Sequence, residues 1–389
     1  MRKEFDFNAP AVRRGSGCMK WDEAPDSDVI PLWVADMDFR TAPNIIRALS
    51  KRVEHGVFGY TFVDDEYYQR LADWFSSRHG WTFARGQVIY TSGVVPALSA
   101  IIKALTRPGD GVIVQTPVYN CFFSSIRNNG CKIIENPLIC EESGRGEFTF
   151  RIDYDDLQEK VRRQDARILL LCNPHNPAGR VWTAEELRRI AEICREENVT
   201  VVSDEIHCEL CMPGYSYTPF ATIEPSAIVC TSPSKAFNTA GLQIANIVCP
   251  DEGTRVKVDR AINDNEVCDV NPFGIVALKA SYSQEGEEWL SQLIEYLHGN
   301  YMMMKTMLQE AVPDFKVSKL EGTYLPMIDV RAYGMPVENL ERELLEEAKV
   351  WVNSSAMYGC EGFLRINIAT QRQNLRAGIS RLIYFFMTE

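Results

Sequence analysis

The sequence lacks features that would place the protein in a membrane, in a secretory pathway or on nucleic acid. No run approaches the roughly 18 consecutive apolar residues of a transmembrane helix. The start, MRKEFDFNAP, has no apolar core of a secretory signal. The formal net charge is −12, and an acidic surface does not attract the phosphate backbone of nucleic acids. We therefore expect a cytoplasmic protein that binds neither membrane nor nucleic acid.

Paired cysteines are also scarce, although the chain of 389 residues contains 12 cysteines. Cys208 and Cys211, beside His207, form the one close pair, and no second pair lies at a matching spacing. Zinc binding or redox exchange is one interpretation of this pair, and two packed thiols are the other. We expect buried thiols of a reducing compartment, without a metal. Apolar residues make up 46% of the chain, enough for large cores.

The stretch IVCTSPSKAFNTAGLQ, residues 228–243, joins an apolar strand to a loop that carries Ser232, Ser234 and Lys235. A lysine at the mouth of a buried strand loses its proton more easily than a surface lysine, and a neutral amine can form a Schiff base. Pyridoxal 5′-phosphate (PLP) requires this chemistry. A solvated surface lysine is the alternative, and the neighbouring motifs favour the cofactor.

Two upstream strands end in side chains that suit the same cofactor. The β-branched run VTVVSDEIH, residues 199–207, ends in Asp204, at the strand end where open α/β sheets bind ligands. A carboxylate there can pair with a pyridinium nitrogen and keep it protonated. The apolar run RILLLCNPHNPAGR, residues 167–180, leads to Asn176, which can donate a hydrogen bond to a ring oxygen.

Two further stretches provide sites for anions. The strand at residues 87–90 is followed by a turn with Gly93, Val94 and Val95 and then by a helix, so free backbone N–H groups can bind a phosphate. Arg365 stands alone in the apolar strand FLRIN. A buried guanidinium is costly without an anion, and a two-point grip on a substrate α-carboxylate would satisfy it. A structural ion pair is the alternative.

These motifs carry a family resemblance. In this order, Asn-Pro-Ala-Gly, Asp-Glu-Ile-His, Ser-x-Ser-Lys and FLRINIATQR resemble the fold type I PLP enzymes, the aspartate aminotransferase superfamily, over essentially the whole chain. The phrases RRGSGCMKWD and PLWVADMDF narrow the resemblance to the carbon–sulfur lyase branch, the cystathionine β-lyases of MalY/PatB type. The resemblance implies an α/β fold with a mostly parallel seven-stranded central sheet.

The pattern of elements agrees with two domains. Strands alternate with helices between about residues 153 and 232, which predicts a mostly parallel sheet in a large domain at residues 45–281. Long helices near residues 286–311 and 338–349 follow, with strands near residues 315–320, 322–330 and 362–369. Residues 1–44 and 282–389 are expected to form a smaller α+β domain.

The resemblance implies roles for three more residues. Tyr119 corresponds to the aromatic residue that stacks on the pyridine ring, although a core tyrosine under a loop is the alternative. Tyr60 would cross the interface of a homodimer to the cofactor phosphate of the neighbouring subunit, so that the active sites are shared. An interface tyrosine without such a task is its alternative. Ala35 lies in the amino-terminal arm that borders the substrate pocket.

The sequence departs from the wider superfamily at three positions. Gln243 replaces the arginine that usually follows the lysine by eight residues, which leaves the phosphate to serines, backbone amides and Tyr60. His207 stands where many relatives have a tyrosine that contacts the ring oxygen. Glu266 falls near the position where aspartate aminotransferase binds a distal carboxylate with an arginine, so a dicarboxylic substrate is disfavoured.

We therefore predict a PLP-dependent lyase that acts on cystathionine, cysteine or related cysteine S-conjugates by α,β-elimination and releases a thiol, such as homocysteine, with pyruvate and ammonia. Lys235 would take the Cα proton, and either Lys235 or Tyr119 would protonate the departing sulfur. An aminotransferase that uses the same residues is one alternative. A PLP-binding regulatory protein that acts through a protein partner is another, without an attached DNA-binding domain, because no helix-turn-helix is visible.

Overall fold

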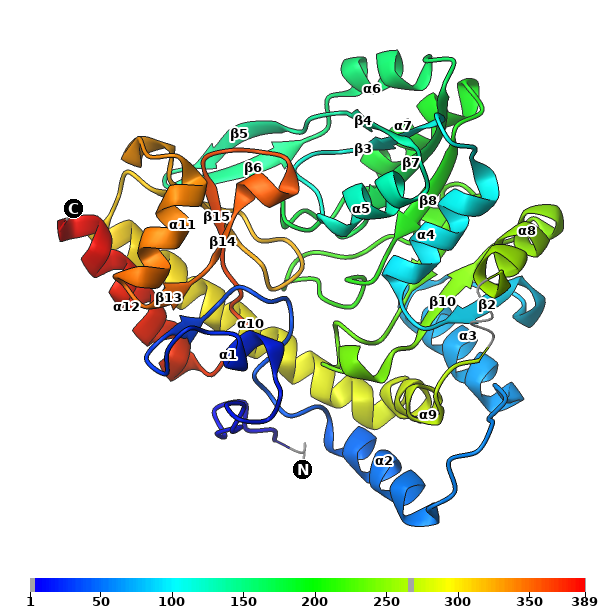
Figure 1. Cartoon of the computed structure of the whole chain (residues 1–389), viewed down its shortest axis with the longest axis horizontal. Helices are drawn as coiled ribbons and strands as arrows, with labels where there is room; N and C mark the ends of the chain where they lie inside the picture. Colours follow the sequence, from blue (N-terminus) through cyan, green and yellow to red (C-terminus); the bar gives the residue numbers. More distant parts are fainter. Residues whose placement is uncertain (1–3, 265–268, 389) are drawn as a thin grey trace.

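The computed structural model describes residues 4–264 and 269–388, and a seven-stranded sheet forms its centre (Figure 1). The strands, in spatial order, are β2 (Val88–Thr91), β10 (Ala245–Val248), β9 (Ile228–Thr231), β8 (Thr200–Asp204), β7 (Ala166–Cys172), β3 (Gly111–Val114) and β4 (Lys132–Glu135). All neighbours are parallel except that β10 runs antiparallel to both β2 and β9. The predicted sheet and fold class are confirmed.

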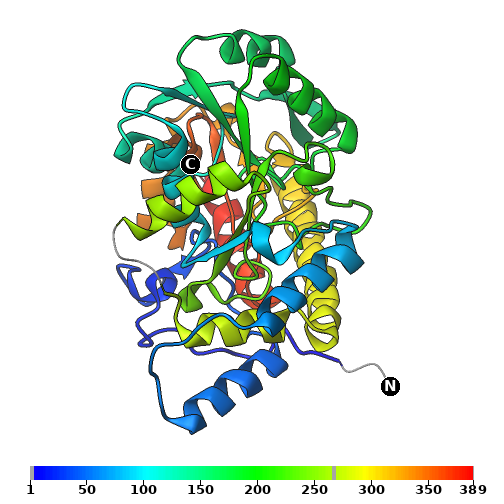
Figure 2. The same cartoon turned by 90° about the vertical axis from the view of Figure 1, so that its right-hand side faces the viewer.

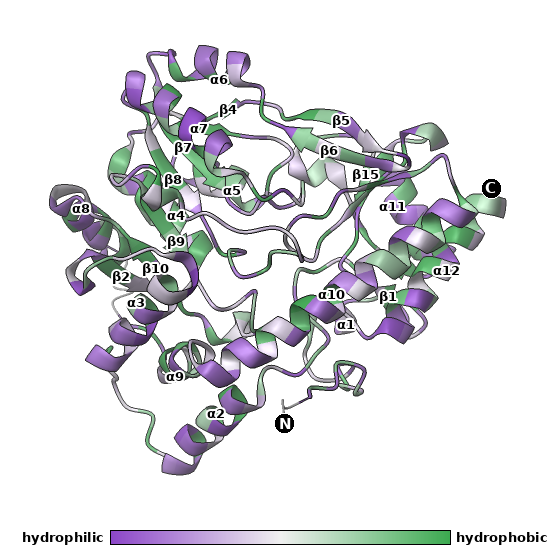
Figure 3. Ribbon diagram, turned by 180° about the vertical axis from the view of Figure 1, so that it is seen from behind, coloured by the Kyte–Doolittle hydropathy of each residue, from purple (hydrophilic) through white to green (hydrophobic). Residues whose placement is uncertain are grey.

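Helices cover both faces of this sheet, so its strands are apolar on both sides. Residues 168–171 of β7 are buried without interruption, and Figure 3 shows the hydrophobic colour concentrated on the central strands and the hydrophilic colour on outer helices such as α6. On one face lie α4 (Val94–Leu105), α5 (Cys121–Asn128) and α8 (Glu252–Asn263). On the other lie α6 (Tyr154–Val161) and α7 (Ala184–Glu196).

A second sheet of six strands belongs to the smaller part of the molecule. Its order is β14 (Asn353–Ser354), β15 (Phe363–Arg365), β12 (Met327–Asp329), β11 (Lys316–Ser318), β6 (Glu147–Arg151) and β5 (Ile139–Gly144). The β5–β6 hairpin, which sequence reasoning missed, pairs with β11 from within residues 45–281, so this sheet crosses the predicted domain boundary. That division stays a prediction.

The remaining helices frame the two sheets. They are α1 (Met19–Asp22), α2 (Pro43–His55), α3 (Asp65–His79), α9 (Pro272–Ser281), α10 (Gln284–Ala311), α11 (Val337–Glu346) and α12 (Arg372–Thr388). Figures 1 and 2 show α2 projecting from the body, with its connection to α3 looping away from the sheet. No helix in the described part of the chain combines the length and apolarity needed to cross a membrane.

The amino-terminal arm is held by buried charges. Strand β1 (Ile30–Pro31) pairs with β13 (Val350–Trp351). Lys20 is fully buried, and its ammonium lies 2.9 Å from the carboxylate of Asp38. Arg13 and the indole N–H of Trp21 also donate to Asp38, each at 2.8 Å. Burial alone would raise the pKa of Asp38, but Lys20 and these hydrogen bonds outweigh it and hold the pKa below its usual value.

Removing Asp38 would leave the buried ammonium of Lys20 with only its longer contact, 3.8 Å to the carboxylate of Asp36. We expect Asp38→Ala to lower the free energy of unfolding by about 3–5 kcal/mol, as for other broken buried ion pairs. The double variant Lys20→Met/Asp38→Ala removes both charges and should recover most of this loss. Urea unfolding measures both variants, and a single variant as stable as the wild type would contradict a structural role of the pair.

Candidate active site

A cavity of about 220 Å³ opens at the carboxyl ends of β7, β8 and β9. These strands are neighbours in the parallel part of the sheet, so the residues that follow them meet at one edge. The cavity is lined by ten residues that the sequence singled out: Ala35, Gly93, Val94, Val95, Tyr119, Asn176, Asp204, His207, Ser234 and Lys235. Side chains up to 200 residues apart in the sequence therefore form one site.

Lys235 carries the amine of this cavity. Its Nζ donates a hydrogen bond of 2.6 Å to the carbonyl oxygen of Ala35 in the amino-terminal arm. Burial lowers the pKa of Lys235 to about 8, and the nearby guanidinium of Arg365 acts in the same direction. An appreciable fraction of the amine is therefore neutral near physiological pH, as covalent attachment of an aldehyde requires.

Asp204 and His207 have their charges set by burial. Burial raises the pKa of Asp204 to about 7, although the backbone N–H of Ile206 donates to its carboxylate at 3.1 Å. A positively charged ring nitrogen beside Asp204 would favour its ionised form. Burial lowers the pKa of His207 to about 3, so its imidazole is neutral. Its Nδ1 atom is buried and has no hydrogen-bond partner in the described part of the chain.

The phosphate end of the site is built from main chain. Helix α4 begins at Val94, with Gly93 as its N-cap and no side chain capping its first N–H groups. These N–H groups can bind an anion. Ser234 lines the cavity beside them. Ser232, in contrast, lies outside the lining, where its hydroxyl donates at 2.7 Å to the carbonyl of Ile244 and contacts the hydroxyl of Ser234.

Arg365 is not among the residues that line the cavity, but it contacts one of them, Asn176. Its guanidinium donates to Asn176 at 3.2 Å and to the carbonyl of Trp33 at 2.8 Å, and it lies over the ring of Tyr358. Its Nε atom is buried without a partner, and no carboxylate of residues 4–264 or 269–388 forms an ion pair with it. The side chain is 3% exposed, so the unneutralised charge is suited to an anionic ligand.

Two aromatic residues differ in their placement. Tyr119 lines the cavity, and burial together with the neighbouring thiol of Cys121 raises its pKa, so its hydroxyl keeps its proton at neutral pH. Tyr60 is fully exposed and takes no part in the cavity of its own chain. Its predicted role across an interface stays a prediction.

Several cavity residues were not predicted from sequence, and one prediction lies outside the description. Ser92, Pro96, Cys172, Ile206, Ala240 and Ile244 also line the cavity. Gln243 lines it with φ of +54°. Glu266 lies outside the described residues. Cys208 is buried in the apolar core, and no group of His, Cys, Asp and Glu in the described part of the chain could hold a metal.

The residues fit PLP on chemical grounds: an amine with a lowered pKa, a buried carboxylate, a buried Nδ1 without a partner and an uncapped helix start border one cavity. Each complements a different part of that cofactor: its aldehyde, ring nitrogen, ring oxygen and phosphate. The volume of about 220 Å³ leaves room for a small cofactor. One chain therefore brings together groups for all four parts of the cofactor.

Comparisons with known proteins agree with this geometry. Cystathionine β-lyase PatB of Bacillus subtilis (strain 168) is 38% identical, over 97% of this chain and 99% of that protein. Protein MalY of Escherichia coli (strain K12) is 32% identical, over 97% and 98%. The crystal structure of cystalysin from Treponema denticola, which contains a PLP cofactor, matches with a TM-score of 0.93 and 33% identity, covering 99% of each chain.

The family model that matches residues 27–382 is that of aminotransferase class I and II. The match spans both sheets and every residue of the cavity. The resemblance read from the sequence motifs is thus confirmed by matches that extend along nearly the whole chain. The chain belongs to the aminotransferase class I and II family.

Proposed function

We propose that the protein is a PLP-dependent carbon–sulfur β-lyase that acts on cystathionine or related cysteine S-conjugates and releases a thiol, pyruvate and ammonia. The observation that carries this proposal is the cavity lined by Lys235 and Asp204, with Arg365 bonded to the lining residue Asn176, in a chain that a cystathionine β-lyase matches over 97% of its length. The similarity to cystalysin, whose structure contains PLP, supports the cofactor.

Different residues along the cavity would hold different parts of PLP. When bound, PLP supplies an electron sink that makes the substrate Cα proton acidic. Lys235 would provide the covalent anchor, and Asp204 would keep the ring nitrogen protonated. Asn176 and His207 would hold the ring oxygen. Tyr119 would cover the ring, and Ser234 with the N–H groups of residues 93–95 would hold the phosphate.

Arg365 would orient the substrate, and Lys235 and Tyr119 are the two residues that could transfer protons to or from it. Arg365 binds the α-carboxylate through its planar fork, which fixes the Cα–H bond toward Lys235. The amine of Lys235, freed when the amine of the substrate takes its place, would then take the Cα proton. The carbon–sulfur bond would break, and water would hydrolyse the remaining three-carbon fragment to pyruvate and ammonia. Tyr119, which keeps its proton at neutral pH, and Lys235, once protonated, are the two groups that can protonate the sulfur.

Product analysis tests this function. A lyase should release thiol and pyruvate in equal amounts from cystathionine without any added keto acid. An aminotransferase, which the family model also describes, would need a keto acid acceptor and would return an amino acid. Lys235→Ala is the control, because without this lysine neither thiol release nor amino-group transfer should occur. Thiol release that depends on a keto acid would contradict the lyase.

We also propose a cytoplasmic homodimer. The cysteines in the described part of the chain are free thiols, which suits a reducing compartment. Val57, Phe58, Tyr60 and Phe62 are between 54% and 103% exposed, on the connection that loops away after α2 (Figure 2). A second copy of the chain would bury these apolar side chains and would receive the hydroxyl of Tyr60 at its cofactor phosphate.

The lowered pKa of Lys235 predicts the pH dependence of cofactor attachment. Burial lowers this pKa to about 8, so below pH 8 the neutral fraction of the amine rises with pH. The rate at which the cofactor-free protein attaches PLP should rise about tenfold per pH unit from pH 6 and level off above about pH 8. Borohydride trapping and peptide mapping measure attachment at Lys235. A rate that still rises toward pH 10 would indicate an ordinary lysine.

Asp204→Asn tests the partner of the ring nitrogen. The amide keeps the size of the side chain but removes its charge, so folding and attachment to Lys235 should survive. Loss of a charge-assisted hydrogen bond of about 1.5–3 kcal/mol should slow Cα proton exchange in deuterated solvent by roughly 10- to 150-fold. NMR follows the exchange, with kcat for thiol release measured alongside. Exchange at the wild-type rate would make Asp204 a structural carboxylate.

Two variants separate assembly from the proposed role of Tyr60. Phe62→Glu introduces a charge into the proposed apolar interface and should shift the protein to monomers. Tyr60→Phe keeps the apolar surface but loses the hydroxyl, so it should stay dimeric and bind PLP more weakly. Sedimentation velocity and PLP titration measure the two effects. A monomeric wild type would contradict the shared active site.

A further inference from the structure

Residues 33–39, here called the strap, cross the active site without forming a helix or a strand. The strap connects β1 to the segment before α2, and its carbonyls accept hydrogen bonds from distant side chains. The carbonyl of Trp33 accepts from Arg365 at 2.8 Å and from Asn353 at 3.0 Å. The carbonyl of Ala35 accepts from Lys235 at 2.6 Å and from Tyr324 at 2.9 Å. The strap therefore touches both Lys235 and Arg365.

Asn238 holds one end of the strap, three residues after Lys235. Its Oδ1 accepts from the N–H of Met37 at 3.0 Å. Its Nδ2 donates to the carbonyls of Met37 at 2.9 Å and Phe39 at 2.8 Å. Asn238 has φ of +53°, a left-handed conformation that asparagine tolerates better than most residues. Its backbone conformation and its side-chain hydrogen bonds thus both support the contact between the loop after Lys235 and the strap.

Asn367 holds the middle of the strap, two residues after Arg365. Its Nδ2 donates to the carbonyl of Asp36 at 2.6 Å and to that of Val34. Its Oδ1 accepts from the N–H of Ala369 at 2.7 Å, and the residue is fully buried. Two asparagine amides, each close in sequence to one key residue of the site, thus hold the same short segment.

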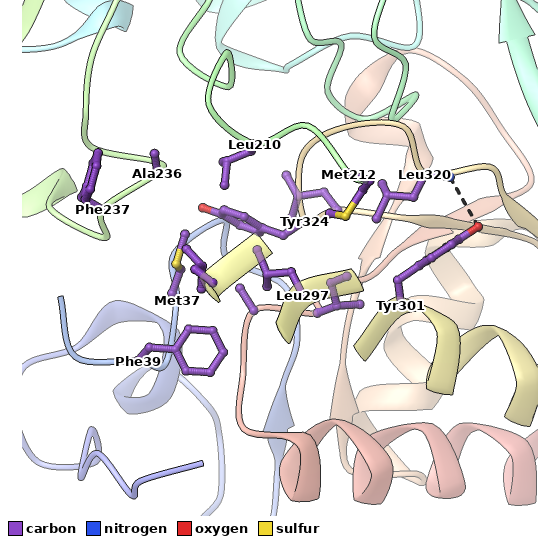
Figure 4. Close-up of a cluster of buried hydrophobic side chains, with 14 of the residues drawn as sticks. Met37, Phe39, Leu210, Met212, Ala236, Phe237, Leu297, Tyr301, Leu320 and Tyr324 are labelled. Atoms are coloured by element: carbon purple, nitrogen blue, oxygen red, sulfur yellow. Dashed lines mark hydrogen bonds between the residues drawn. The ribbon is translucent and has the colours of Figure 1, made fainter. Parts of the chain in front are cut away.

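Apolar contacts also hold the strap against the residues that follow Lys235. Figure 4 shows Met37 and Phe39 of the strap in one cluster with Ala236 and Phe237, which directly follow Lys235, and with Tyr324. Met37, Phe237 and Tyr324 are each no more than 1% exposed. Because protein interiors are close-packed, the strap and the lysine loop cannot shift independently of each other.

We propose that Asn238 and Asn367 are positioning residues: they fix the strap so that its Ala35 carbonyl orients the amine of Lys235 and its Trp33 carbonyl orients Arg365. Released from the cofactor, the amine has several rotamers, and its hydrogen bond to the Ala35 carbonyl restricts them. The inference rests on the proposed function in that Lys235 acts as the base, and it concerns residues that touch neither cofactor nor substrate.

Three variants test the proposal. Asn238→Gly removes the amide while keeping a residue that adopts positive φ at no cost. Asn367→Ala removes the second amide. Asn136→Ala is the matched control: Asn136 is also fully buried, and its Nδ2 donates to the carbonyl of Asp153 at 2.9 Å and to the carboxylate of Asp156 at 2.8 Å, away from the strap. All three variants lose comparable hydrogen bonds.

Two readouts decide the outcome. Hydrogen–deuterium exchange should rise in peptides covering residues 33–39 for both strap variants and stay at the wild-type level for the control. The substrate Cα proton should exchange about 10- to 100-fold more slowly in the strap variants, as expected for a misplaced catalytic group, with PLP affinity unchanged. The control should lose stability in urea and keep its exchange rate.

The proposal is overturned if Cα exchange in both strap variants matches the wild type, or if Asn136→Ala slows it equally. Unchanged strap peptides in both variants would also overturn it, since the asparagines would then not fix the strap. Failure of the proposed function looks different. A wild type that exchanges the Cα proton but releases no thiol would contradict the lyase and leave the role of the asparagines intact.

Discussion

Burial of the Lys235 amine is the constraint on which the rest of the site depends. An ammonium removed from water is unfavourable, so the pKa falls to about 8 and the neutral form becomes accessible. The amine lines the cavity with reduced access to solvent, and the carbonyl of Ala35 accepts a hydrogen bond from it at 2.6 Å. The amino-terminal arm must therefore lie against the lysine loop before the site is complete, although it is the most distant part of the chain in sequence.

Burial also determines the charges of the other titratable groups in the site. His207 is neutral, and burial raises the pKa of Asp204 to about 7 although the charge of Lys235 acts in the opposite direction. Arg365 is buried with no carboxylate partner in the described part of the chain, and the start of α4 adds uncapped N–H groups. The site thus combines positive charge at Arg365 and at the start of α4 with the carboxylate of Asp204. A phosphate, a carboxylate and a cationic ring nitrogen complement this arrangement, which is why a PLP-bound amino acid suits it.

The sequence predicted those parts of the site that local pattern determines. Asn176, Asp204 and Lys235 each follow an apolar strand, and parallel strands carry such residues to one edge. Local pattern could not show that β10 enters the sheet antiparallel, or that the β5–β6 hairpin pairs with β11, because both depend on partners far along the chain. Ser232 and Ser234 look equivalent in sequence, yet only Ser234 lines the cavity. Strands near residues 315–330 are also shorter than predicted, since apolar runs continue beyond the paired residues.

The strap shows why the amino-terminal phrases of the sequence belong with the carboxyl-terminal motif. A segment without helix or strand must satisfy its backbone carbonyls by other means, and here side chains donate to them from residues 13, 235, 238, 324, 353, 365, 367 and 371. The ion pair between Lys20 and Asp38 then fixes the strap to the part of the amino-terminal arm that precedes it. RRGSGCMKWD supplies Arg13 and Lys20 of that ion-pair network, PLWVADMDF supplies the strap, and FLRINIATQR supplies Arg365 and Asn367. The first phrase contacts the strap through side-chain ion pairs with Asp38, and the third contacts it through hydrogen bonds to main-chain carbonyls, so all three phrases meet beside the Lys235 amine.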